Sequence, residues 1–258
     1  MRDLVAVGFR CAQPLECGAM TTKRTSESNV ERGPFAWLLI TQVVFVAMSP
    51  VISSFPRGRW IQVAVLFAIL IAGVYAAAAR RGFLIIALFL LVPALFAWLG
   101  PDVFSVTEDE VSRLLSAAAC FAFTAVVVTA AVAGHRNVSR ETIIGGIDVY
   151  LLIGMAFMFL HQAVGIANPA AYTMDGKFLS ELSSSAPEFP SLSTMLYFSF
   201  TTLTTLGYGD IVPRSSIARL LTSTESVMGQ LYVAIFIARL VSIQVSQRIV
   251  QSRRSDES

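Results

Sequence analysis

Long uncharged apolar runs, separated by short polar segments, dominate the pattern of residues along this chain. Five runs of 20 to 26 residues contain no Asp, Glu, Lys or Arg. A helix needs about 20 mostly apolar residues to cross a hydrocarbon core of about 30 Å. The pattern therefore predicts membrane helices. Their expected ranges are about 35–55, 60–79, 83–99, 114–134 and 147–168, with a sixth at about 215–246.

The composition agrees with this pattern. Hydrophobic residues make up 55% of the chain and charged residues only 14%, whereas an ordinary soluble domain is about 25% charged. The mean hydropathy is +0.68 and the formal net charge is +2. These values argue against a soluble enzyme, a disordered tail or a nucleic-acid-binding protein, and we expect no nucleic-acid partner.

Basic residues indicate the orientation of the helices, because Lys and Arg favour the cytoplasmic side of short loops. With the N-terminus inside, twelve basic residues fall on the cytoplasmic side and six on the other. This distribution predicts a multi-pass protein of the cell membrane with six crossings and both termini inside, surrounded by membrane lipid. Segment 1–34 is expected as a cytoplasmic N-terminal tail, 35–134 as a four-helix membrane domain and 251–258 as a cytoplasmic C-terminal tail.

A sixth uncharged run, between Glu188 and Asp210, differs from the other five because it contains eight Ser and Thr residues and closes on Gly-Tyr-Gly. A helix facing lipid would not concentrate so many hydroxyls. Non-helical backbone at membrane depth is tolerated when it is buried in protein or lines a water-filled path. We therefore expect a re-entrant segment with a short helix over about 193–204.

The stretch from Ser199 to Asp210 reads SFTTLTTLGYGD and resembles the pore loop and selectivity filter of potassium channels. The signature there is Thr-Val-Gly-Tyr-Gly, commonly followed by Asp, and Leu206 replaces the usual Val or Ile. The resemblance covers about 141–250. It implies a pore domain with an outer helix (147–168), a turret (169–192), a pore helix (193–204), a filter (205–210) and an inner helix (215–246).

This resemblance implies an all-α transmembrane fold with six membrane helices, a re-entrant pore helix and a filter loop. Because a single pore loop cannot surround an ion, it also implies a homotetramer, with three identical subunits as partners. Rings of backbone carbonyls can replace the hydration shell of K⁺. The ligands expected for K⁺ are the carbonyl oxygens of Thr205, Leu206, Gly207 and Tyr208.

Within this filter, Gly207 and Gly209 permit backbone angles that residues with a Cβ resist. Asp210 at the outer mouth has two possible roles, in a ring of carboxylates that concentrates cations or in a hydrogen bond behind the filter. Tyr208 is expected to point away from the axis and to pack against two pore-helix aromatics. The pore-helix residues expected to support the filter are Tyr197, Phe198, Thr201 and Thr204.

The inner helix contains the candidate hinge and gate. Gly229 lies near the position where the resemblance places a hinge, and it either permits a bend or only allows close helix packing. At 100° per residue, one stripe of the helix is expected to line the cavity and the lower pore. Its members are Gln230, Val233 or Ala234, Ile237 and Val241, of which Ile237 and Val241 are candidates for an apolar constriction.

Glu225 is the one acid deep in a predicted span, and an intramembrane charge suggests a function. Two readings stay open: a structural brace held by Thr201, Ser199 or Arg219, and a role in gating or pH sensing. His161 is a second candidate for a pH response. Asp148, near the inner end of its helix, is expected to lie at the membrane interface.

Segment 114–134 contains no Lys or Arg, so it lacks the repeated charges of a voltage sensor. The sequence predicts a potassium-selective channel that conducts K⁺ passively and needs no organic cofactor. The alternatives are a weakly selective cation channel and a non-conducting membrane sensor or accessory subunit. We expect no enzyme, because the chain has no GxSxG, HExxH or P-loop motif.

Overall fold

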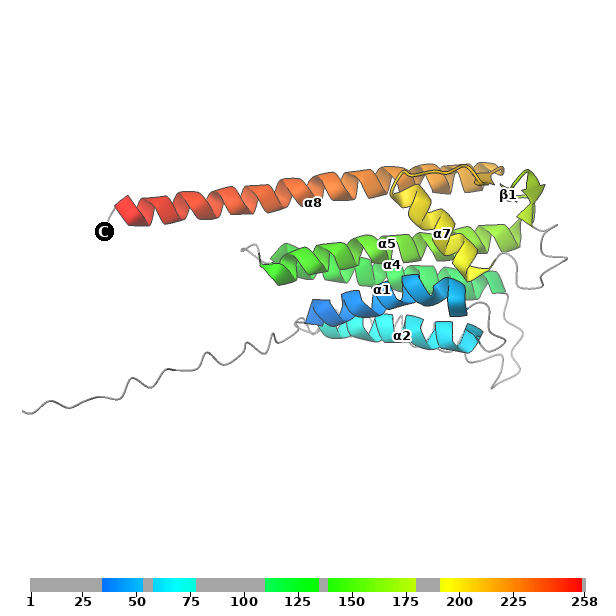
Figure 1. Ribbon diagram of the computed structural model, residues 1–258, viewed down its shortest axis with the longest axis horizontal. Coiled ribbons are helices and arrows are strands. Elements are labelled where there is room, and N and C mark those ends of the chain that lie inside the picture. The colour runs from blue at the N-terminus through cyan, green and yellow to red at the C-terminus, as the bar shows by residue number, and fades with distance from the viewer. Residues whose placement is uncertain (1–33, 53–57, 78–109, 135–138, 180–190, 257–258) are drawn as a thin grey trace, which may run out of the picture. The chain divides into compact units, whose positions relative to one another are not determined.

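Helices dominate the computed structural model, which describes residues 34–52, 58–77, 110–134, 139–179 and 191–256 (Figure 1). The predicted helix over 83–99 and most of the predicted tail over 1–34 lie outside these ranges. In chain order the elements are α1 (Pro34–Ile52), α2 (Gly58–Ala77), α4 (Glu110–Gly134), α5 (Arg140–Ala167), β1 (Tyr172–Met174), β2 (Lys177–Phe178), α7 (Leu192–Leu203), β3 (Ile211–Pro213) and α8 (Ser216–Asp256).

Three of the described helices are long and apolar enough to cross a membrane. They are α4, α5 and the part of α8 from Ser216 to Arg248. The apolar parts of α1 and α2 are shorter, over Phe35–Val51 and Ala64–Gly73. The fold is therefore mostly helical and suited to a membrane, as the uncharged runs indicate, while six crossings stay a prediction.

The outer helix α5 begins at Arg140 rather than at the expected 147. Ser139 caps this helix, because its side-chain oxygen accepts a hydrogen bond from the backbone N–H of Thr142 at 3.2 Å. A Ser cap satisfies one of the donors that a helix leaves open at its start. The polar first turn is thus part of the helix, and Asp148 lies two turns inside it.

Helix α5 is the central element of the described fold. It packs along α4 and also contacts α1, α7 and α8. At the α4 contact the rings of Phe121 and Phe159 lie 5.5 Å apart, and both side chains are almost fully buried. The pore helix α7 crosses the outer half of α5 and ends against α8 (Figure 1).

A three-stranded antiparallel sheet in the order β2-β1-β3 was not expected from the sequence. The fold is mostly helical, as expected, and this small sheet is an addition that the sequence analysis did not foresee. Strands β1 and β2 form a hairpin across Asp175 and Gly176, whose φ angles are 50° and 80°. An Asp-Gly pair is a strong hairpin signal, but β1 is only three residues long and also depends on pairing with β3, which follows the Gly-Tyr-Gly segment.

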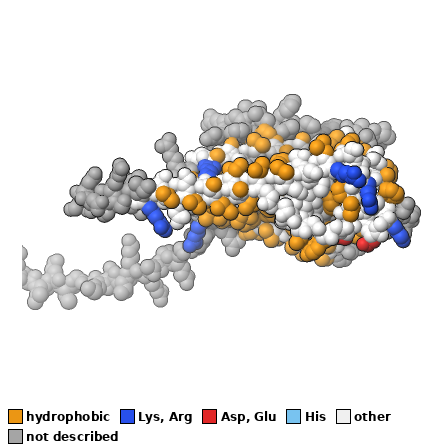
Figure 2. Space-filling model, turned by 90° about the horizontal axis from the view of Figure 1, so that it is seen from above, with side chains coloured by type: hydrophobic (Ala, Val, Ile, Leu, Met, Phe, Trp, Pro, Cys, Tyr) orange, Lys and Arg blue, Asp and Glu red, His pale blue; other side chains and the backbone are white. Residues whose placement is uncertain are grey.

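The inner helix α8 leaves much of its apolar surface exposed in the single chain. On the face shown in Figure 2, hydrophobic side chains occupy the middle of this surface, and most Lys and Arg side chains lie toward its two ends. The large hydrophobic side chains of α8 that are at least half exposed are Ile217, Leu220, Val227, Leu231, Ile235, Ile237, Val241 and Val245. An apolar surface of this size suits lipid or another protein chain.

Candidate ion-conduction site

The pore helix α7 is held by hydrogen bonds at both ends. Ser191 caps its start by accepting from the backbone N–H of Thr194 at 3.2 Å. At its C-terminal end, the hydroxyl of Tyr150 on α5 donates to the carbonyl oxygen of Leu203 at 3.2 Å. The hydroxyl of Ser226 on α8 donates to the carbonyl oxygen of Thr202 at 3.3 Å. The carbonyl end of α7 is therefore fixed between α5 and α8.

The segment that follows α7 alternates in backbone conformation. Thr205, Gly207 and Gly209 have φ angles of 59°, 52° and 79°. In a segment that alternates between left-handed and right-handed residues, successive backbone groups can point to a common side. The left-handed region is open to Gly but costs another residue about 1–3 kcal/mol, so Thr205 is held there by its surroundings.

Backbone hydrogen bonds turn the N–H groups of this segment toward α7. The carbonyl oxygen of Thr201 accepts from the N–H of Leu206 at 2.8 Å and from that of Gly207 at 3.1 Å. The N–H of Thr205 donates to the carbonyl oxygen of Thr202 at 2.9 Å, and Gln230 of α8 donates to the Thr205 hydroxyl at 3.1 Å.

The carbonyl oxygens of the segment have a different environment. Among the described residues, no hydrogen bond ends on the carbonyl oxygen of any residue from 205 to 208. Residues 204–209 are also exposed in the single chain. The predicted K⁺ ligands, Thr205, Leu206, Gly207 and Tyr208, thus keep their carbonyl oxygens available to another ligand.

The two pore-helix aromatics expected beside Tyr208 point in different directions from α7. The ring of Tyr197 stacks on that of Tyr208, with centroids 6.5 Å apart and planes within 7°. Phe198 is buried instead against His161, at 4.9 Å in a T-shaped contact. Adjacent residues of a helix point about 100° apart, so only one of them reaches Tyr208 of the same chain.

Asp210 follows the Gly-Tyr-Gly segment and is tied to its surroundings. Its backbone carbonyl accepts from the N–H of Asp175 in the β1–β2 turn at 3.2 Å. The two roles considered for its side chain, in a ring of carboxylates or in a hydrogen bond behind the filter, both stay predictions.

Gly229 lies where α8 approaches the end of α7 most closely. A Cβ at this position would overlap the backbone carbonyl oxygen of Leu203. Helix α8 continues through Gly229 without a break. The structure therefore shows the packing role considered for this glycine and leaves the hinge a prediction.

The predicted pore stripe lies on the exposed side of α8 in the single chain. Gln230, Val233, Ile237 and Val241 are all exposed. The opposite side of the helix packs on α5 and α4. There the Tyr232 hydroxyl donates to the carbonyl oxygen of Gly146 at 2.6 Å.

Arg239 adds a second contact on that side of α8. Its guanidinium donates to the carbonyl oxygens of Val132 at 3.1 Å and Ala133 at 2.6 Å. Both carbonyls belong to the last turn of α4, where a cation is favourable. Sequence reasoning identified neither Tyr232 nor Arg239, although the adjacent glycines Gly145 and Gly146 signal a close approach to α5.

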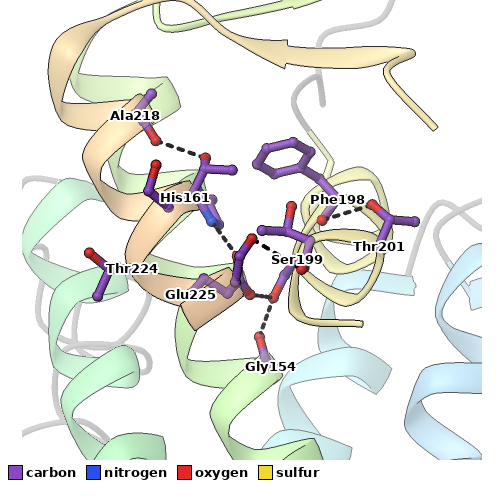
Figure 3. Close-up of polar contacts among 12 residues, drawn as sticks. Gly154, His161, Phe198, Ser199, Thr201, Ala218, Thr224 and Glu225 are labelled. Carbon is purple, nitrogen blue, oxygen red and sulfur yellow. Dashed lines mark hydrogen bonds and ion pairs between the residues drawn. The ribbon is translucent and has the colours of Figure 1, made fainter. Parts of the chain in front are cut away.

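Glu225 is fully buried behind the pore helix, with Ser199 and His161 as its partners (Figure 3). Ser199 is one of the three partners considered from the sequence, whereas Thr201 bonds instead to the carbonyl oxygen of Phe198 and Arg219 to that of Pro213. The pairing with His161 was not expected.

Asp148 is also fully buried against the neighbouring helices. Its expected place at the membrane interface stays a prediction, because burial within the protein does not report depth in a membrane. Within the described part of the chain, neither of its carboxylate oxygens has a hydrogen-bond partner.

Comparisons with known proteins point to one class for this site. Residues 147–245 match the family model described as "Ion channel". The chain is 35% identical over 80 residues to the A-type voltage-gated potassium channel KCND3 of Homo sapiens, a match that covers 31% of this chain and 12% of that protein. It is 44% identical over 57 residues to the voltage-gated potassium channel Kch of Escherichia coli, covering 22% of this chain and 13% of Kch.

A further relative has a different title. The voltage-gated potassium channel regulatory subunit KCNG1 of Homo sapiens is 30% identical over 81 residues, covering 31% of this chain and 15% of that protein. No solved structure matches the chain. Within residues 147–245, this chain is thus similar to an ion channel domain and to the matched segments of potassium channels. The chain spans only about an eighth of the length of the first of these relatives.

Proposed function

We propose that this protein is a potassium-selective channel that conducts K⁺ passively through a pore formed by four identical subunits. The observation that carries the proposal is the backbone of residues 205–208. The N–H groups of residues 205–207 donate to carbonyl oxygens of α7, while the carbonyl oxygens of residues 205–208 accept no hydrogen bond among the described residues. Four such segments around one axis would supply rings of oxygens for a dehydrated cation.

The exposed surfaces of the single chain support an assembly. Residues 204–209 and the stripe of Gln230, Val233, Ile237 and Val241 are uncovered in one subunit. An ion path with one such segment on one side only would leave the ion partly in lipid, which is costly for a charge. We propose six crossings per subunit, with both termini cytoplasmic, in the cell membrane.

The test of this function is a K⁺ flux assay on the purified protein in liposomes. We expect K⁺ uptake, a reversal potential that follows the K⁺ gradient rather than the Na⁺ gradient, and no requirement for an added cofactor. Replacement of Gly207 by Ala should abolish the flux, because a Cβ is strained at a φ of 52°. Ser246→Ala, a change at an exposed residue near the end of α8, is the matched control.

A second candidate function is that of a non-conducting regulatory subunit, which the similarity to KCNG1 favours. In that case the protein alone would pass no K⁺ and would change the current of a conducting channel when the two are produced together. A third outcome, equal permeation of K⁺ and Na⁺, would identify a weakly selective cation channel.

A further inference from the structure

A continuous chain of hydrogen bonds runs behind the pore helix through side chains from four elements. Tyr172 of β1 lies 2.7 Å from Nδ1 of His161 on α5, and Nε2 of His161 lies 2.8 Å from Oε2 of Glu225 on α8. The second oxygen of Glu225 lies 2.5 Å from the hydroxyl of Ser199 on α7, which lies 2.7 Å from the carbonyl oxygen of Gly154 on α5 (Figure 3). The four side chains are at most 1% exposed.

The number of protons available in this hydrogen-bonded chain decides whether the carboxyl group of Glu225 is protonated. The Ser199 hydroxyl has one proton and two short contacts. Because the carbonyl oxygen of Gly154 can only accept, the Ser199 proton goes to that oxygen. The contact between Ser199 and Glu225 then needs a proton on the carboxyl oxygen, so Glu225 donates to Ser199 as a neutral acid.

The other half of the chain fits this assignment. The unprotonated oxygen of Glu225 accepts from Nε2–H of a neutral His161, and Nδ1 of His161 then accepts from the hydroxyl of Tyr172. Each proton has one acceptor, and every polar group between Tyr172 and Gly154 is satisfied. Buried polar networks are stable when all of their members are paired in this way.

The ionised alternative leaves groups unmatched. If Glu225 were a carboxylate and His161 an imidazolium, the single proton of Ser199 would have to serve two acceptors. Nδ1–H would then donate to Tyr172, whose own proton would lose its acceptor in the chain. An ion pair without its full set of hydrogen bonds seldom recovers the cost of leaving water.

The residues around this hydrogen-bonded chain favour the neutral forms of Glu225 and His161. His161 packs between the rings of Phe157 and Phe198. The other titratable groups that face Glu225 are the phenols of Tyr150 on α5 and Tyr172 on β1. Of the described residues that bond to members of the chain, none is Lys or Arg.

We propose that Glu225 is a neutral carboxylic acid in a one-way hydrogen-bonded chain from Tyr172 to Gly154, and that this chain is a positioning device for the pore helix. It joins the inner helix to α7 through Ser199. It also joins the inner helix to β1, which pairs with the strand after the Gly-Tyr-Gly segment. The effect on conduction rests on the proposed channel function, whereas the proton assignment does not.

Glu225→Gln is the decisive variant because glutamine reproduces the protonated acid. Its amide oxygen can accept from His161 and its amide N–H can donate to Ser199. We expect this variant to keep the K⁺ flux and the K⁺ to Na⁺ permeability ratio, and Glu225→Ala to lose both severalfold. If Glu225 were an anion paired with imidazolium, Gln would leave a buried cation without a partner. Loss of assembly or of selectivity in Glu225→Gln would therefore overturn the proposal.

Infrared spectroscopy tests the proton assignment even if the protein passes no ions. The difference spectrum between the wild type and Glu225→Gln in detergent should contain the carbonyl stretch of a protonated acid at neutral pH. A difference confined to the carboxylate bands would contradict the neutral state. A protonated-acid band in a protein without K⁺ flux would support the proton assignment while rejecting the channel function. Failure of the proton assignment can therefore be told apart from failure of the channel function.

Ser199→Ala tests the other end of the chain. It removes the acceptor of Glu225 and the donor to Gly154, so the protonated-acid band should shift in frequency. In an active channel the permeability ratio should also fall severalfold. Ser116→Ala is the matched control, because among the described residues that hydroxyl bonds only to the carbonyl of Arg113 in its own helix. If the protonated-acid band keeps its frequency in Ser199→Ala, Glu225 donates its proton elsewhere, and the proposed hydrogen-bonded chain is wrong.

Discussion

The guanidinium of Arg239 donates a 2.6 Å hydrogen bond to the carbonyl oxygen of Ala133, 106 residues earlier in the chain. This contact joins the lower half of the inner helix α8 to the last turn of α4. In the sequence, Arg239 lies between Ile237 and Val241, the two candidates for the apolar constriction. The inner helix therefore has a direct attachment to α4 as well as to α5.

Replacement of Arg239 by Ala should weaken this attachment. Hydrogen bonds from charged groups contribute about 1.5–3 kcal/mol, and a cation at a helix C-terminus adds about 0.3–1 kcal/mol. We expect the free energy of unfolding in detergent to fall by about 1–3 kcal/mol, measured by thermal unfolding. Arg248→Ala, a change at an exposed position of the same helix, should have little effect. Equal stabilities of the two variants would contradict a structural role for the Arg239 contact.

Gly229→Ala distinguishes the two roles considered for this residue. Ala is a better helix former than Gly by roughly 1 kcal/mol, so a glycine that served only as a hinge would give a more stable variant. Because a Cβ would overlap the carbonyl oxygen of Leu203, we expect the opposite, a loss of about 1–3 kcal/mol from overpacking. Thermal unfolding in detergent gives the sign, and a rise in stability would reject the packing role.

The bond from Gln230 to Thr205 should stabilise the strained end of the filter. Thr205 has a φ of 59°, and Gln230 donates to its hydroxyl at 3.1 Å. We expect Gln230→Leu and Thr205→Ala each to lower the K⁺ to Na⁺ permeability ratio, and Thr205→Ser to retain it. A double-mutant cycle of the first two should give a coupling of about 0.5–1.5 kcal/mol. Strictly additive effects would show that the bond does not support the filter.

Tyr172 should make stability depend on alkaline pH. Burial raises the pKa of the Tyr172 phenol in the folded protein. The folded state therefore keeps its proton longer than the unfolded state, whose tyrosine titrates near pH 10. The stabilisation from Tyr172 is complete below about pH 10 and is lost as the pH rises from there through the folded pKa.

The measurement is the free energy of unfolding from pH 8 to pH 11 for the wild type and for Tyr172→Phe. The difference between the two should be constant below about pH 10 and should shrink above it. Tyr150→Phe, which removes the donor to Leu203, is a second tyrosine variant for comparison. A difference that grows with pH would contradict the direction of the shift in Tyr172.

The membrane helices and the Gly-Tyr-Gly segment could be read from the sequence because both are local signals. An uncharged run reports a helix through its own length, and glycine reports a left-handed backbone through its missing Cβ. The described parts of the predicted helices agree to within a few residues, except at the start of α5 and at the end of α8, which continues to Asp256 instead of ending at about 246. The start of α5 depended on the Ser139 cap, which the uncharged run, beginning after Asp148, did not include.

The pairing of Glu225 with His161 was decided only by the tertiary structure. The two residues are 64 positions apart, and neither helix shows in its sequence which of its faces meets the other. In a soluble helix, polar residues mark the face turned toward water, but a membrane helix carries no such mark, so the sequence does not show which faces meet. For the same reason, the sequence did not predict the contact of Arg239 with the end of α4 or the packing of Phe198 against His161.

The sequence by itself thus determined that the chain is a mostly helical membrane protein with a potassium-channel-like filter, because these properties depend on residue type over short windows. The tertiary structure decided which polar groups lie behind the filter and how α8 is attached. Those contacts depend on the packing of helices that are far apart in the chain. In an apolar environment a few buried hydrogen bonds, such as those of Glu225 and Ser199, then define the arrangement that hydrophobicity alone leaves open.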